Sequence, residues 1–81
     1  MGRNDAVEVR KERIMKVNEM IMAMLTADKG KDGIPLDMAI AEMEYNIGLT
    51  EKRIMEYAII GEKRGRFSID VKNNRIRKAE S

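Results

Sequence analysis

The residues best suited to chemistry in this sequence are the cations that follow Gly65. Residues 66–78 hold five basic side chains and one acidic side chain, Asp70, although the whole chain of 81 residues has a net charge of only +2. Ammonium and guanidinium groups concentrated in a short segment bind phosphate groups, with a strength that falls as salt is added. We therefore expect this segment to bind phosphates. The alternative is an ordinary charged edge that protects a strand from aggregation.

Catalysis and metal binding have little support in the sequence. The chain has no cysteine and no histidine, which removes thiol nucleophiles, sulfur-based zinc sites and the commonest general base. The acidic residues Asp37, Glu42 and Glu44 stand in a segment without any basic partner. We expect no enzymatic activity, no cofactor, no metal site and no small-molecule substrate.

Length and composition indicate a single soluble domain. Apolar residues make up 43% of the chain and charged residues 37%, which suits one compact core with a charged surface. The longest apolar run, residues 20–25, is far shorter than the roughly 20 residues that span a bilayer. The N-terminus lacks the pattern of a secretory signal, so we expect a cytoplasmic protein.

The elements that must position the cations are indicated by the hydrophobic period. Apolar residues recur at three- and four-residue spacing from Val7 onwards, which predicts a long first helix over about 5–27. Pro35 is well placed to begin a second helix, and Thr50 to cap a third. These two helices lie within about 35–64, and Gly65 is the expected end of the last one.

A β-hairpin is predicted for residues 66–78, because the apolar period changes to two after Gly65. Asn73 and Asn74 tolerate the positive φ of a two-residue type I′ turn. In that register Lys72 faces Arg75, Val71 and Ile76 point together toward the core, and Asp70 pairs with Arg77.

This order of helix, helix, turn, helix and basic hairpin resembles the winged helix-turn-helix superfamily of DNA-binding domains. The resemblance covers a little over half of the chain and implies an α+β fold, with three helices and a C-terminal β-hairpin wing. It departs from the family at Glu44, where tight turns have a small residue four positions before the turn glycine, here Gly48. We therefore expect a looser turn, with the second helix ending near Glu44 or Tyr45. The residues that carry the resemblance are 34–43, 48–50, 54–60, 65–67 and 68–77.

The resemblance implies binding to double-stranded DNA, with the third helix in the major groove and the wing on the backbone or minor groove. The protein would act as a small transcriptional regulator or an architectural factor. Glu56 would repel phosphate unless it accepts from a cytosine or holds Lys52 in position. The expected DNA-binding residues are Lys52, Arg53, Glu56 and Lys63 on the third helix, and Lys72, Asn73, Asn74, Arg75, Arg77 and Lys78 in the wing.

The sequence is also compatible with two other functions, and it predicts a second copy of the chain as a partner. Glu56, an exposed Ile60 and the modest net charge suit a winged-helix protein-interaction module of a replication or transcription assembly. A methionine-rich first helix suits peptide binding by a chaperone-like or inhibitor protein. The surplus length of the first helix predicts a homodimer through paired helices. Its expected interface residues are Val7, Ile14, Val17 and Ile21.

Overall fold

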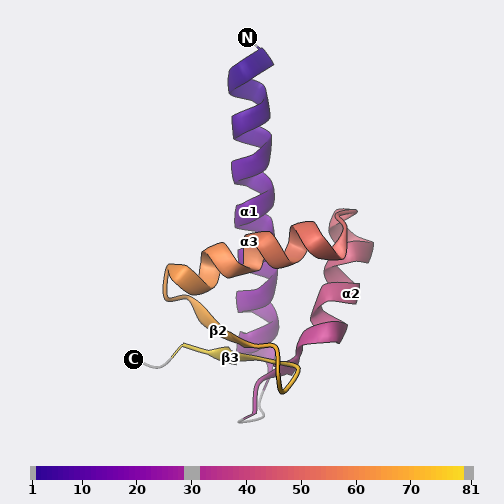
Figure 1. The fold of residues 1–81 in the computed structure, drawn as a ribbon, viewed down its shortest axis with the longest axis vertical. Helices are drawn as coiled ribbons and strands as arrows, with labels where there is room; N and C mark the ends of the chain where they lie inside the picture. Colours follow the sequence, from indigo (N-terminus) through magenta and orange to yellow (C-terminus); the bar gives the residue numbers. More distant parts are fainter. Residues whose placement is uncertain (1, 29–31, 80–81) are drawn as a thin grey trace.

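The computed structural model describes residues 2–28 and 32–79, and side chains from residue 8 onward. It has three helices and a small antiparallel sheet with strand order β1-β3-β2, which confirms the expected α+β fold. A β-hairpin follows the helices and is compatible with a wing (Figure 1). The elements are α1 (Gly2–Ala27), β1 (Ile34–Pro35), α2 (Leu36–Ile47), α3 (Glu51–Lys63), β2 (Phe67–Asp70) and β3 (Arg75–Lys78).

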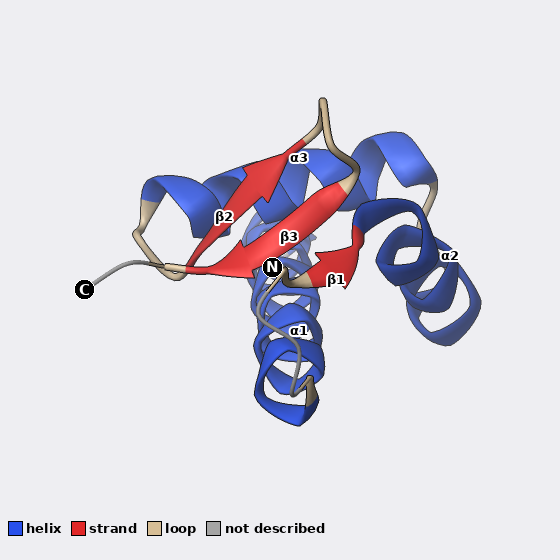
Figure 2. Cartoon of the chain, turned by 90° about the horizontal axis from the view of Figure 1, so that it is seen from below, coloured by secondary structure: helices blue, strands red, loops and turns tan. Residues whose placement is uncertain are grey.

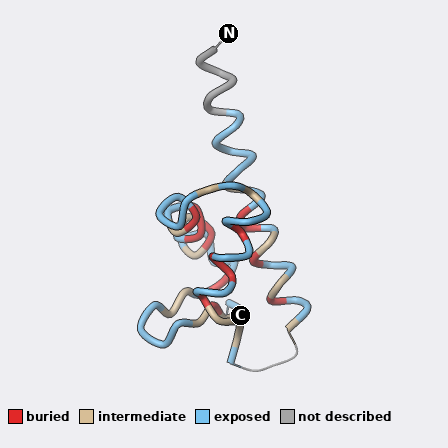
Figure 3. Tube along the Cα trace, turned by 90° about the vertical axis from the view of Figure 1, so that its right-hand side faces the viewer, coloured by how far each residue is buried: buried red, intermediate tan, exposed pale blue. Residues whose placement is uncertain are grey.

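The core lies where α1, α2, α3 and the sheet meet around the C-terminal half of α1. In Figure 1, α3 crosses in front of α1, α2 lies beside it and the hairpin closes the lower end. The N-terminal half of α1 extends beyond this body, and its described side chains up to Arg13 are exposed (Figure 3). The buried apolar residues are Val17, Ile21, Leu25, Leu36, Ala39, Ile40, Met43, Ile54, Tyr57, Ala58, Phe67 and Ile76.

The turn between α2 and α3 differs from the expectation. Helix α2 continues to Ile47 instead of ending near Glu44 or Tyr45, and Gly48 follows it in the left-handed region, with φ 78°. The Gly48 N–H donates to the carbonyl oxygen of Glu44 at 3.0 Å and closes the helix end. Glu44 is exposed, so its size does not force the helix to stop early.

Helix α3 begins and ends as expected. The side chain of Thr50 accepts a hydrogen bond from the Arg53 N–H at 3.3 Å, which satisfies one of the free amides of the first turn. At the other end Gly65 has φ 77°, and the N–H of Arg66 donates to the carbonyl of Gly61. The Gly65 N–H also donates to the carbonyl of Glu62, and these two bonds turn the chain sharply from α3 into β2.

Gly61 allows α3 to pack closely against α1. It is buried, and a Cβ atom at this position would overlap the side chains of Asn18 and Phe67. Asn18 is itself buried, and its Nδ2 donates to the carbonyl oxygens of Ile14 in α1 and Tyr57 in α3. The crossing of the two helices is therefore held by close packing and by a polar bridge.

The hairpin forms, but in a different register from the predicted one. Ile76 faces Ile69, and Asp70 faces Arg75, so the strands are shifted by two residues relative to the expected pairing. Residues 71–74 form a four-residue loop in place of the type I′ turn, and only Asn74 has a positive φ, 56°. Val71 is 67% exposed in this loop, so the expected inward position is wrong.

A third strand was not expected. The short β1 pairs with β3, with Ile34 opposite Ile76 and Pro35 opposite Arg75. Pro35 is therefore the residue before α2 rather than its first residue, and it has an extended backbone, with ψ 127°. The hairpin is thereby joined to the start of α2.

Candidate nucleic-acid interface

The outer face of α3 and the hairpin loop lie on the same side of the molecule. Figure 2 shows α3 and the loop between β2 and β3 together, with α1 on the opposite side. The buried face of α3, which includes Ile54 and Gly61, packs toward the core. Its opposite face therefore points away from α1, toward the same space as the loop.

On this outer face the structure brings together three of the four expected α3 residues. By the helical step of about 100° per residue, Lys52, Glu56 and Lys63 lie opposite Ile54, and all three are exposed. Arg53 lies to one side and pairs with Glu56, with 3.2 Å between Nη1 and Oε2. Glu56 is thus held by Arg53, and it does not pair with Lys52 among the described residues.

The exposed apolar residue on this face is Ile59, not Ile60. Ile59 is 39% exposed, whereas Ile60 is half-buried and packs against the core. The two neighbours differ because a 100° step turns Ile60 toward α1 and leaves Ile59 between Glu56 and Lys63.

Two of the expected wing residues have partners within the hairpin. Nη1 of Arg77 donates to the Asp70 carboxylate at 2.7 Å, which confirms the expected pair, although the two residues do not face each other in the register. The backbone and side-chain nitrogens of Asn73 also donate to Asp70, at 3.1 and 2.8 Å. The pKa of Asp70 is lowered to about 2, mainly by the hydrogen bond from the Asn73 side chain and next by the one from Arg77. Asp70 thus stabilises the loop.

Asn74 joins the loop to the first turn of α2. Its carbonyl oxygen accepts from the Leu36 N–H, and its side-chain oxygen accepts from the Asp37 N–H, both at 3.0 Å. Its side-chain nitrogen donates to Asp37 Oδ1 at 3.0 Å, and this bond is the main cause of a lowered pKa for Asp37. Because Pro35 provides no side-chain cap, the hairpin loop supplies the acceptors that α2 lacks. Asn74 is therefore a cap for α2.

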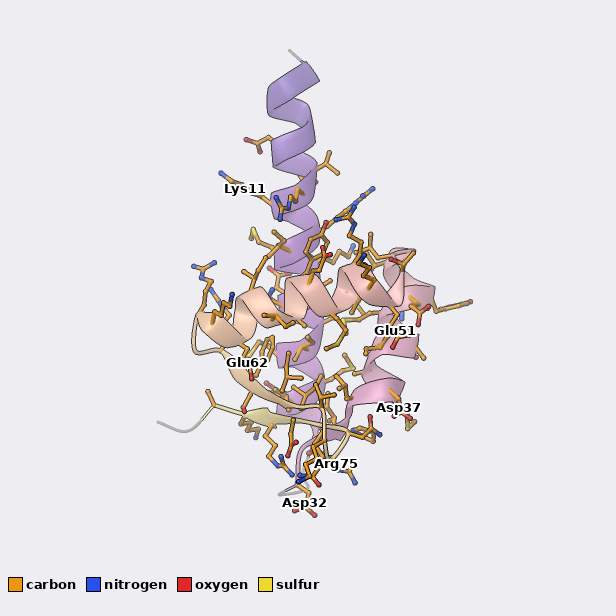
Figure 4. The ribbon with its side chains drawn as sticks, in the orientation of Figure 1. Lys11, Asp32, Asp37, Glu51, Glu62 and Arg75 are labelled. Carbon is orange, nitrogen blue, oxygen red and sulfur yellow. The ribbon has the colours of Figure 1, made fainter. Side chains whose placement is uncertain are left out.

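The remaining wing cations divide into two positions. Lys72 is exposed in the loop, and Arg75 is half-buried at its base, where its charge also lowers the pKa of Asp37. Figure 4 shows Arg75 and Asp37 at the same end of the molecule. Lys78 lies at the far end of β3, opposite Phe67, about 10 Å along the strand from Arg75. The structure does not bring Lys78 to the loop.

The expected dimer interface is wrong for two of its residues. Val17 and Ile21 are completely buried in the core of their own chain, so a second subunit cannot reach them. Ile14 is half-buried and packs against the same core. Val7 lies outside the residues whose side chains the structure describes.

One polar contact that sequence reasoning missed also positions the hairpin. Oε2 of Glu62 in α3 accepts from the Ile69 N–H of β2 at 2.7 Å. This bond occupies a donor on the free edge of the sheet and fixes the hairpin to α3. No periodic pattern signals it. For the Asn74 cap, the only signal is that Pro35 leaves the first amides of α2 in need of a distant acceptor.

Comparisons with known proteins add no relationship: no protein-family model matches the chain, and neither the curated proteins nor the solved structures compared with it gave a match. Within residues 2–28 and 32–79, no helix is long and apolar enough to cross a membrane. No cluster of acidic side chains in the same part of the chain could hold a metal ion. The α3 face and the hairpin loop are therefore candidates for the functional site by their geometry alone.

Proposed function

We propose that this protein binds duplex DNA through the outer face of α3 and the hairpin loop, as a small transcriptional regulator or architectural factor. The observation that supports this proposal is a set of exposed cations on one side of the molecule. Lys52, Lys63 and Lys72 have no ion pair with any described residue, and Arg75 stands at the base of the loop that carries Lys72. Cations without an internal partner keep their full attraction for phosphate groups.

In this proposal α3 enters the major groove, and the loop contacts the backbone beside it. Lys52 lies near the capped N-terminus of α3, where backbone amides and the helix dipole also favour a phosphate. The loop does not move freely, because Asn74 bonds it to α2. The protein thus presents a preformed surface, which reduces the entropic cost of binding.

The test is a salt titration with a random-sequence duplex. Four phosphate contacts per chain should give a slope of log K against log salt of roughly −3 to −4, since each contact contributes about −0.9. Fluorescence anisotropy of labelled DNA measures this directly. A slope near zero, or no binding at low salt, would rule out the proposal.

A second candidate is a protein-interaction module of a larger assembly. It is favoured by Ile59, which is 39% exposed in the middle of the α3 face, and by Glu56, whose charge opposes phosphate binding. Replacing Ile59 with Ser distinguishes the two functions. DNA affinity should change by less than about threefold if phosphate contacts dominate, whereas an apolar protein interface should lose a central contact.

A further inference from the structure

The exposed flank shared by α1 and α2 carries opposite charges at its two ends. On α1, Val9, Arg13 and Lys16 recur at spacings of four and three, which places them on one side of the helix. Met20, Met24 and Ala27 continue this stripe downward. Met24 and Ala27 line a groove of about 450 Å³ together with Met38, Ala39 and Glu42 of α2. The basic stripe and the groove therefore lie on the same flank.

The lower end of this flank is acidic and apolar. Met38, Glu42 and Tyr45 follow one another at spacings of four and three on the outer side of α2. Met38 is 68% exposed and Tyr45 88% exposed, although most large apolar side chains of the described chain lie in or against the core. Glu42 is the acidic residue of this stripe, because Asp37 and Glu44 lie on the other side of α2, where Asp37 is bonded to Asn74.

The upper end is basic and extends beyond the rest of the fold. Arg13 and Lys16 give the stripe its positive charge at this end, and the described side chains of this part of α1 are exposed up to Arg13 (Figure 3). Val9 is 42% exposed among them. A helix of about a dozen residues is marginal in water without packing, so this projection is expected to gain stability from a partner.

From these features we infer that the flank binds the same flank of a second copy, in an antiparallel homodimer with twofold symmetry. A twofold rotation places the basic upper end of each chain against the acidic lower end of the other, and Val9 against the apolar side chains of α2. Such a self-complementary surface forms a closed dimer. The outer face of α3 and the hairpin loop stay free, because they lie on another side of the molecule (Figure 2).

This dimer differs from the one expected from the sequence, whose interface was Val7, Ile14, Val17 and Ile21. It does not depend on the proposed DNA binding, and its test contains no DNA. Sedimentation equilibrium should give a mass twice the 9.3 kDa of the chain. A monomer at all concentrations, or an open-ended polymer, would overturn the inference.

Charge reversal identifies the surface. Arg13→Glu and Glu42→Lys should each weaken the dimer about tenfold or more, because each places like charges together. The variant that combines both changes should recover an affinity within about threefold of the original. Lys11→Glu is the matched control, because the same charge change falls on the opposite side of α1 and should leave the dimer unchanged.

All three positions are exposed, so each variant should retain its helical circular dichroism. Recovery in the combined variant also shows that the single changes did not act through misfolding. A dimer that resists both single reversals, or that Lys11→Glu weakens equally, would contradict the assigned surface.

Discussion

The hairpin and the outer face of α3 both carry polar side chains but use them differently. In the hairpin, Asn73, Asn74 and Arg77 are bonded to carboxylates or to the start of α2. On α3, Lys52 and Lys63 have no ion pair with any described residue. The difference separates residues that hold the surface in place from residues that are free to bind a ligand.

Basic and polar residues that cluster in one segment are therefore not all available to a ligand. Of the six wing residues expected to bind DNA, two asparagines and one arginine have internal partners, and Lys78 lies away from the loop. A count of charges along the sequence therefore overstates the number of available phosphate contacts.

The largest expected effect comes from reversing one free cation in each region. The double variant Lys52→Glu with Lys72→Glu should bind duplex DNA about a hundredfold more weakly at low salt, since two attractive contacts become repulsive. Anisotropy titration measures this loss. Lys78→Glu is the matched control in the same hairpin and should change affinity by no more than about threefold. An equal loss in the control would show that the whole hairpin, and not only its loop, contacts DNA.

A smaller effect is expected from removing the bond between the loop and α2. Asn74→Ala should lower the free energy of unfolding by about 1 kcal/mol, the typical contribution of a helix cap. Urea denaturation measures this change. Asn74→Gly keeps the favourable positive φ and separates the lost hydrogen bonds from backbone strain. By contrast, Lys52→Ala should alter stability by less than about 0.5 kcal/mol. Equal effects of Asn74→Ala and Lys52→Ala would remove the distinction between the two regions.

The smallest expected effect is the acid response of the loop. The folded state lowers the pKa of Asp70 from 3.8 to about 2, so its ionised form stabilises the fold fully above about pH 4. This contribution is lost as the pH falls toward 2. A carbon-13 NMR titration of the Asp70 carboxyl group should give a midpoint near 2. Asn73→Ala should raise the midpoint, because the Asn73 side chain is the main cause of the shift. A midpoint of 3.8 in the unmodified chain would contradict the bonded loop.

The residue pattern by itself determined the helices, their main boundaries and the presence of a hairpin. Local chemistry is sufficient for these features: Thr50 caps α3, Gly65 ends it and the three- and four-residue spacing of apolar side chains selects the buried faces. The same pattern placed Lys52, Glu56 and Lys63 on one exposed face.

Tertiary structure alone decided the hairpin register and the choice of free cations. A shift of two residues leaves every side chain on the same face of a strand, so the alternation that buries Ile76 fits both registers equally. The amides of α2 that Pro35 cannot cap take their acceptors from Asn74, a residue distant in sequence. Bonds of this kind depend on which segments meet in space, and for this reason the partners of Asn73, Asn74 and Glu62 became evident only in the folded chain.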